Sequence, residues 1–263
     1  MKQILIAFFA MFALQSSASV MVYDEVDMPF ANYAGYLKES FDINVTMPRE
    51  FTDLHESGFY TPIAKHESGY HPAKMVGAML QSADKNCILL LPNLKLRQQW
   101  GMKNATKDNC GGDFMGDVYF SVRGAWTHEY FFSNPPLIDI SRYSKSVPAQ
   151  RFNAERANIV WLPANDSIGG QHFCAKDLLF FGKPGRPVYD IIVLFTAEGA
   201  KNKQKYLEPI YESLKFGNNG DWTFNKQANE AAIGKYIVKD SAMPNDGRIT
   251  SLAPVKPQKD GNK

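Results

Sequence analysis

The strongest structural signal in this sequence is a β-hairpin in the segment FCAKDLLFFGKPGRPVYDIIVLFT, residues 173–196. Two apolar runs are joined there by residues 182–186, which read GKPGR. Glycine and proline are the residues that tight turns require, because they supply backbone angles that other residues adopt poorly. The pattern predicts two antiparallel strands, so any fold for this chain must accommodate a long antiparallel pair.

The part of the chain before this hairpin shows both helical and strand periodicities. Four aromatic or leucine side chains recur at helical spacing and predict one short helix: Phe30, Tyr33, Leu37 and Phe41. Residues 41–47 alternate between apolar and polar, as in a strand with one buried face, and Pro48 ends the run. Further strands are expected on both sides of a polar turn at residues 82–86, at 117–126, and at 158–163, where Pro163 closes the segment.

An amphipathic helix is expected after the hairpin, in the segment KYLEPIYESLKF. Its apolar stripe consists of Leu207, Ile210, Tyr211 and Leu214. Proline fits the first turn of a helix, so Pro209 predicts a start near Glu208, and Gly217 predicts the end. Runs of strands with a few helices, without strict alternation of the two, predict an α+β domain.

The element order resembles that of the PsbP/DcrB-like domains. An early strand that ends in proline (FDINVTMPREF) is followed by a meander of hairpins and by a long strand with a helix ending in IYESLKF. The similarity spans Phe41 to Phe216 and implies an α/β/α sandwich, with a central antiparallel sheet and helices packed on it. It also implies a place among mostly non-catalytic exported or accessory proteins, and it assigns no active-site residues.

The N-terminus reads as a bacterial secretory signal peptide, which we place at residues 1–19. Lys2 is followed by an apolar run from Ile4 to Leu14 and by the small residues at 16–18. The mature protein is therefore expected to be periplasmic or secreted and not integral to the membrane. We expect the α+β domain at residues 20–217, a small C-terminal appendage at 218–240, and a disordered, Pro/Gly-rich tail at 241–263.

The charge balance and the cysteines add two constraints. The chain has 29 basic and 27 acidic residues without a basic stripe, so a nucleic-acid role has no electrostatic support. Three cysteines allow at most one internal bridge. Cys87, in the run CILLLP, reads as a buried small hydrophobe, and Cys110 and Cys174 are the candidates for a disulfide.

The segment HESGFYTPIAKHESGYHPAK repeats His-Glu-Ser-Gly at residues 55–58 and 66–69. His55, His66, Glu67 and His71 offer the imidazole and carboxylate groups that zinc prefers, so this segment is the candidate metal site. The spacing is not that of H-E-x-x-H, which places two histidines one helical turn apart. A metal-dependent enzyme is accordingly an alternative, and no cofactor is our main expectation.

A second alternative is a peptidoglycan hydrolase. ESGYHP followed by GAMLQ resembles the signature of soluble lytic transglycosylases. That resemblance makes Glu67 the catalytic acid and Gln81 the motif glutamine. A carboxyl group with a raised pKa could protonate a glycosidic oxygen. The flanking Gly58 and Pro62, however, do not suit the helix that carries the glutamate in that family.

Aromatic residues provide the candidate contact surface. Trp126 and Tyr130 lie in the segment WTHEYFF, and Tyr60 and Tyr70 lie in the repeat. Tryptophan and tyrosine dominate binding hot spots. The sequence therefore predicts a non-catalytic binding or accessory module whose partner is an envelope or extracellular protein or glycan.

Overall fold

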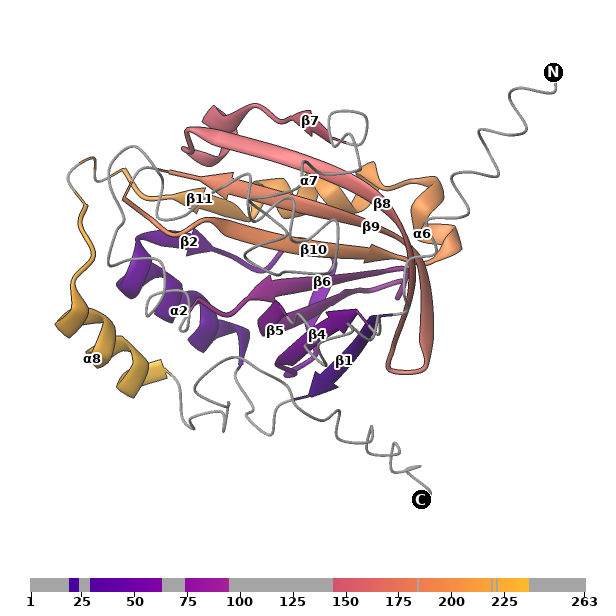
Figure 1. Ribbon diagram of the computed structural model, residues 1–263, viewed down its shortest axis with the longest axis horizontal. Coiled ribbons are helices and arrows are strands. Elements are labelled where there is room, and N and C mark those ends of the chain that lie inside the picture. The colour runs from indigo at the N-terminus through magenta and orange to yellow at the C-terminus, as the bar shows by residue number, and fades with distance from the viewer. Residues whose placement is uncertain are drawn as a thin grey trace, which may run out of the picture.

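A computed structural model describes residues 19–23, 29–62, 74–94, 144–183, 185–218, 220 and 222–236. In chain order the elements are β1 (Ser19–Tyr23), α2 (Phe30–Phe41), β2 (Ile43–Val45), β3 (Phe51–Asp53), β4 (Gly58–Pro62), β5 (Lys74–Ser82), β6 (Cys87–Pro92), β7 (Ser144–Ser146), the 3-10 helix η3 (Ala149–Phe152), β8 (Arg156–Ile168), β9 (Gln171–Gly182), β10 (Tyr189–Phe195), α6 (Ala197–Lys201), α7 (Gln204–Glu212), β11 (Leu214–Phe216) and α8 (Lys226–Tyr236) (Figure 1).

The main sheet has nine strands in the order β1-β4-β5-β6-β10-β9-β8-β7, with β3 paired to β5. Its pairings along this order are antiparallel, and a parallel bridge between Val20 and Ser167 connects β1 back to β8. The tip of the β8–β9 hairpin reaches the turn between β5 and β6, where the side-chain amide of Gln171 donates a hydrogen bond to the carbonyl of Lys85 at 2.5 Å. The sheet is therefore strongly curled, and the chain is an α+β protein as expected.

The two faces of the sheet are buried in different apolar clusters. Alternate residues of β10 divide between them, since Ile191 and Val193 join one cluster and Ile192 and Leu194 the other. This explains why β10 is apolar from Ile191 to Phe195. The first cluster includes residues of α2 and α7. The second gathers side chains from β4, β5, β6, β8, β9 and β10, so it lies inside the curl of the sheet.

Several expected elements are confirmed. The helix with Phe30 and Phe41 at its ends is α2, and the hairpin of residues 173–196 is β9 and β10. The strands around the turn at 82–86 are β5 and β6. Cys87 is fully buried, as its apolar run indicated. The strand expected at 117–126 lies outside the described residues.

Two proline-based boundaries were wrong. Pro163 does not close its strand, because β8 continues to Ile168 through a shift of register between Pro163 and Asp166. Such an irregularity accommodates a residue without a backbone N–H. Pro209 lies inside α7 instead of at its start, because the helix begins at Gln204 and buries Tyr206 and Leu207 against the sheet.

The end of α7 also differs from the expectation. The helix stops at Glu212, and Leu214–Phe216 form strand β11, which pairs antiparallel with β2. Leu214 is buried, so the apolar stripe was read correctly, but its last member belongs to a strand. Pairing with Val45, which lies far away in the sequence, overrides the helical periodicity at this position.

Residues of the expected appendage belong to the main core. Figure 1 shows α8 beside α2, and Ala232 of α8 is buried in the same cluster as that helix. Lys235 and Tyr236 both donate hydrogen bonds to Glu39, at 2.6 and 2.5 Å. The expected tail at 241–263 and residues 1–18 of the expected signal peptide lie outside the described residues, while Ser19 begins β1.

Candidate functional site

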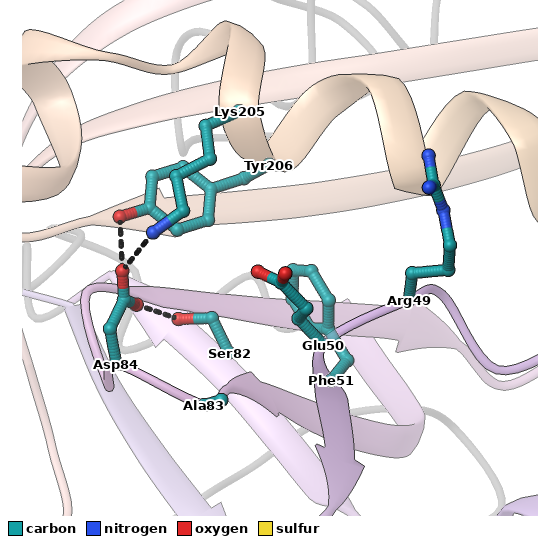
Figure 2. A pocket seen from close by; sticks show the side chains of 8 residues that line it. All are labelled: Arg49, Glu50, Phe51, Ser82, Ala83, Asp84, Lys205 and Tyr206. Atoms are coloured by element: carbon teal, nitrogen blue, oxygen red, sulfur yellow. Dashed lines mark hydrogen bonds and ion pairs between the residues drawn. The ribbon is translucent and has the colours of Figure 1, made fainter.

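A small pocket lies where the β5–β6 turn meets α7. It has a volume of about 80 Å³ and is lined by Arg49, Glu50, Phe51, Ser82, Ala83, Asp84, Lys205 and Tyr206. Three separate segments build it: the turn before β3, the β5–β6 turn and the first residues of α7 (Figure 2). The backbone N–H of Ala83 donates to the carbonyl of Glu50 at 2.8 Å and joins the two turns.

Asp84 is the centre of the polar interactions in this pocket. Its Oδ2 accepts hydrogen bonds from Lys205 at 2.7 Å and from the hydroxyl of Tyr206 at 2.9 Å (Figure 2). Its Oδ1 accepts from the hydroxyl of Ser82 at 2.7 Å and from the backbone N–H of Asn86 at 3.1 Å. Desolvation alone would raise the pKa of Asp84, but these donors outweigh it and hold the pKa well below its usual range.

The other ionisable groups of the pocket respond to this carboxylate. The hydrogen bond to Asp84 raises the pKa of Lys205. Burial raises the pKa of Tyr206 to about 12, and its hydrogen bond to Asp84 acts in the same direction. Arg49 pairs with Glu212 at 3.1 Å, and Figure 2 shows the carboxylate of Glu50 pointing toward α7. The pocket therefore presents fixed charges of both signs.

Substitution of Asp84 by asparagine should lower the free energy of unfolding by about 1 kcal/mol at pH 7, because a partly exposed, hydrogen-bonded ion pair is lost. The pKa of Asp84 is lower in the folded state than in the unfolded state. Its contribution is therefore present above the unfolded pKa, about 4, and is lost progressively as the pH falls from there toward the lower folded pKa. Urea unfolding at pH 7 and at about pH 3 should show a smaller gap between wild type and Asp84→Asn in acid. An equal gap at both pH values would contradict this account.

The first copy of the repeat is only partly described. His55 lies in the loop after β3 with a left-handed φ of 55°. Its backbone N–H donates to Asp53 at 2.9 Å, and its ring Nδ1 lies 3.5 Å from the same carboxylate. Burial raises the pKa of Glu56. Among the described residues no group of three or more His, Cys, Asp or Glu side chains could hold a metal ion.

The remaining predicted site residues fall into two groups. Those outside the described residues are His66, Glu67, Tyr70, His71, Cys110, Trp126 and Tyr130. Tyr60 is described and is buried on β4, so it does not present its ring to solvent as a contact surface would require. Cys174 carries a free thiol. Gln81 lies on β5 and donates to Gln171 at 3.3 Å.

Tyr60 belongs instead to a buried polar cluster that sequence reasoning missed. Its hydroxyl donates to Asp166 on β8 at 2.5 Å, and Lys176 on β9 donates to the same hydroxyl at 3.3 Å. Asp166 and Lys176 lie at least 106 positions from Tyr60 in the sequence, and both stand in strands that contain other polar residues. No local pattern in the sequence therefore pointed to this cluster.

No protein family, characterised protein or solved structure matches this chain. In the part of the chain that the structure describes, no helix combines the length and apolar character needed to cross a membrane.

Proposed function

We propose that this chain is an exported, non-catalytic binding or accessory module. The observation that carries the proposal is the fixed charge of the pocket, where the pKa of Asp84 is lowered and that of Lys205 is raised. General acid–base catalysis works best when the pKa lies near the working pH, and both of these pKa values move away from neutrality. Fixed charges of both signs suit electrostatic recognition of a partner instead.

The surface around the pocket also has the composition of a protein contact. We call Met47, Arg49, Glu50, Asp84 and Lys205 the pocket surface. Met47 is 38% exposed and lies two residues before Arg49, whose guanidinium is also exposed. Methionine and arginine are enriched at protein interfaces relative to the rest of a protein surface. A protein of the envelope or extracellular space is therefore the proposed partner.

Two features of the sequence support the exported, accessory part of the proposal. The N-terminal segment has the pattern of a secretory signal. The element order resembles that of the PsbP/DcrB-like domains, and kinship with these mostly non-catalytic proteins is part of the proposal.

Site-specific photo-crosslinking in the native host tests this function. A photoreactive phenylalanine derivative at Met47 should give one adduct of defined mass, because a bound partner covers this side chain. The matched control places the same group at Gln227, which is exposed on α8 and far from the pocket surface in the sequence. Arg49→Glu should reduce the Met47 adduct while leaving the fold intact, since exposed substitutions change stability by about 0.5 kcal/mol or less.

Three results would overturn the binding-module function. The first is equal adduct formation at Met47 and Gln227. The second is solubilisation of peptidoglycan by the wild type that disappears in Glu67→Gln, which would establish the hydrolase. Stoichiometric zinc in the purified protein that is lost in His66→Ala would favour the metal-dependent enzyme instead.

A further inference from the structure

The buried cluster of Tyr60, Asp166 and Lys176 lies inside the curl of the sheet. The three residues come from β4, β8 and β9. The register of β8 against β9 shifts immediately before Asp166, and such irregularities re-aim a side chain. Tyr60 is itself a member of the apolar cluster inside the curl, and Asp166 is 0% exposed.

The amine of Lys176 is only partly satisfied in this position. An ammonium group has three donors. Lys176 gives one of them to the hydroxyl of Tyr60 at 3.3 Å, and its Nζ lies 3.9 Å from Asp166, beyond hydrogen-bonding distance. The side chain keeps 12% of its surface exposed, so it is not wholly sealed from solvent. Burial lowers the pKa of Lys176, and the charge of Asp166 opposes this without cancelling it.

These conditions are those of a nucleophilic lysine. A lysine that is desolvated by apolar surroundings spends more of its time as the free amine, which attacks carbonyl carbon. The neighbouring hydroxyl of Tyr60 can pass a proton, and Asp166 stands behind that hydroxyl at 2.5 Å. A solvent-exposed lysine, by contrast, is hydrated and remains protonated at neutral pH.

We propose that Lys176 is a reactive amine site that takes a small apolar aldehyde or ketone as an imine. The class of ligand follows from the surroundings. The cluster inside the curl contains Ile168, Phe173 and Leu178, which favour an apolar substituent. The buried carboxylate of Asp166 disfavours a ligand with its own carboxylate, such as a keto acid.

The step conserves atoms and electrons. The nitrogen of Lys176 attacks the carbonyl carbon, and the carbonyl oxygen takes up a proton to give a carbinolamine. The bond from carbon to this hydroxyl then breaks, and the hydroxyl leaves as water with a proton relayed through Tyr60. The nitrogen loses its second proton, and the products are the imine and one molecule of water.

Reductive trapping of the full chain tests the site. The folded protein is incubated at pH 7 with propionaldehyde and cyanoborohydride, and each lysine is followed by peptide mass mapping. Lys176 should be modified on the order of tenfold faster than Lys226, which is 81% exposed, because a lowered pKa raises the fraction of free amine at pH 7. In urea the two rates should become equal.

Further measurements separate a reactive amine from a merely buried one. The rate at Lys176 should level off at lower pH than the rate at Lys226. Pyruvate should modify Lys176 more slowly than propionaldehyde does. Tyr60→Phe keeps the ring and should slow trapping at Lys176 alone, while Asp166→Asn should shift the pH profile of Lys176 downward. Thermal melts establish that each variant is folded before trapping.

The proposal is overturned if Lys176 in the folded wild type reacts no faster than Lys226 at any pH between about 6 and 9, a range in which an ordinary lysine is mostly protonated. It is also overturned if the pH profiles of the two lysines coincide. In either case the cluster is a structural ion pair.

Discussion

Replacement of Arg186 by methionine is expected to lower the free energy of unfolding by about 3 kcal/mol, because removal of one partner of a buried ion pair strands the other charge. The side chain of Arg186 is 1% exposed and forms an ion pair with Asp42, which follows the end of α2. Its guanidinium also lies 5.0 Å from the centre of the Trp222 ring. Asp42 retains some contact with water, so we expect the lower part of the range for buried pairs.

The matched control is the same substitution at Arg49. Arg49 pairs with Glu212 at 3.1 Å, but both side chains are exposed. Exposed ion pairs contribute about 0 to 1 kcal/mol, so Arg49→Met should have little effect. Urea unfolding followed by circular dichroism measures both variants. Similar losses in the two variants would mean that the burial of Arg186 does not account for the contribution of its ion pair to the free energy of unfolding.

Replacement of Gly217 by alanine is the second large effect, with an expected loss of about 2 to 3 kcal/mol from overpacking. A Cβ atom at this position would lie 1.7 Å from Oδ1 and 2.1 Å from Cγ of Asp42. This carboxylate cannot turn away freely, because Arg186 holds it. The backbone N–H of Gly217 also donates to the carbonyl of Asp42 at 2.7 Å, which fixes the two residues side by side.

Two comparisons isolate the steric cause. Gly220→Ala should be nearly neutral, because a Cβ there meets no atom within 4 Å. In the background Asp42→Gly the clash disappears, and the left-handed φ of 54° at that position suits glycine. Gly217→Ala should then cost much less than in the wild type, as chemical denaturation can measure. If Gly217→Ala lowers the free energy of unfolding equally in the Asp42→Gly background and in the wild type, the clash with Asp42 is not the cause of the loss.

Partner binding at the pocket surface and imine formation at Lys176 are separate proposals, and an experiment that contradicts one leaves the other standing. Tyr206 of the pocket is buried in the cluster that includes α2 and α7, whereas Tyr60 belongs to the cluster inside the curl. Substitutions at positions without shared partners act independently. Arg49→Glu should therefore leave trapping at Lys176 unchanged, and Tyr60→Phe should leave crosslinking at Met47 unchanged.

The sequence by itself determined the α+β class, helix α2, the β9–β10 hairpin and the burial of Cys87. Each of these follows from a short-range pattern, since helical and strand periodicity and turn residues act over a few positions. Prolines were a weaker guide. Pro163 and Pro209 were read as boundaries, but a strand irregularity and a buried helical face accommodated them.

Only the tertiary structure decided which distant groups meet. Asp84 and Lys205 are 121 positions apart, and Asp42 and Arg186 are 144 apart. A local pattern shows that a residue is charged or that a segment turns, but it carries no information about the partner across the sheet. Tertiary packing brings these partners together, and it buries Arg186 while Asp84 and Lys205 stay partly exposed. Desolvation lowers the pKa of Lys176. Burial also makes the loss of the ion pair of Arg186 cost more stability than the loss of an exposed pair.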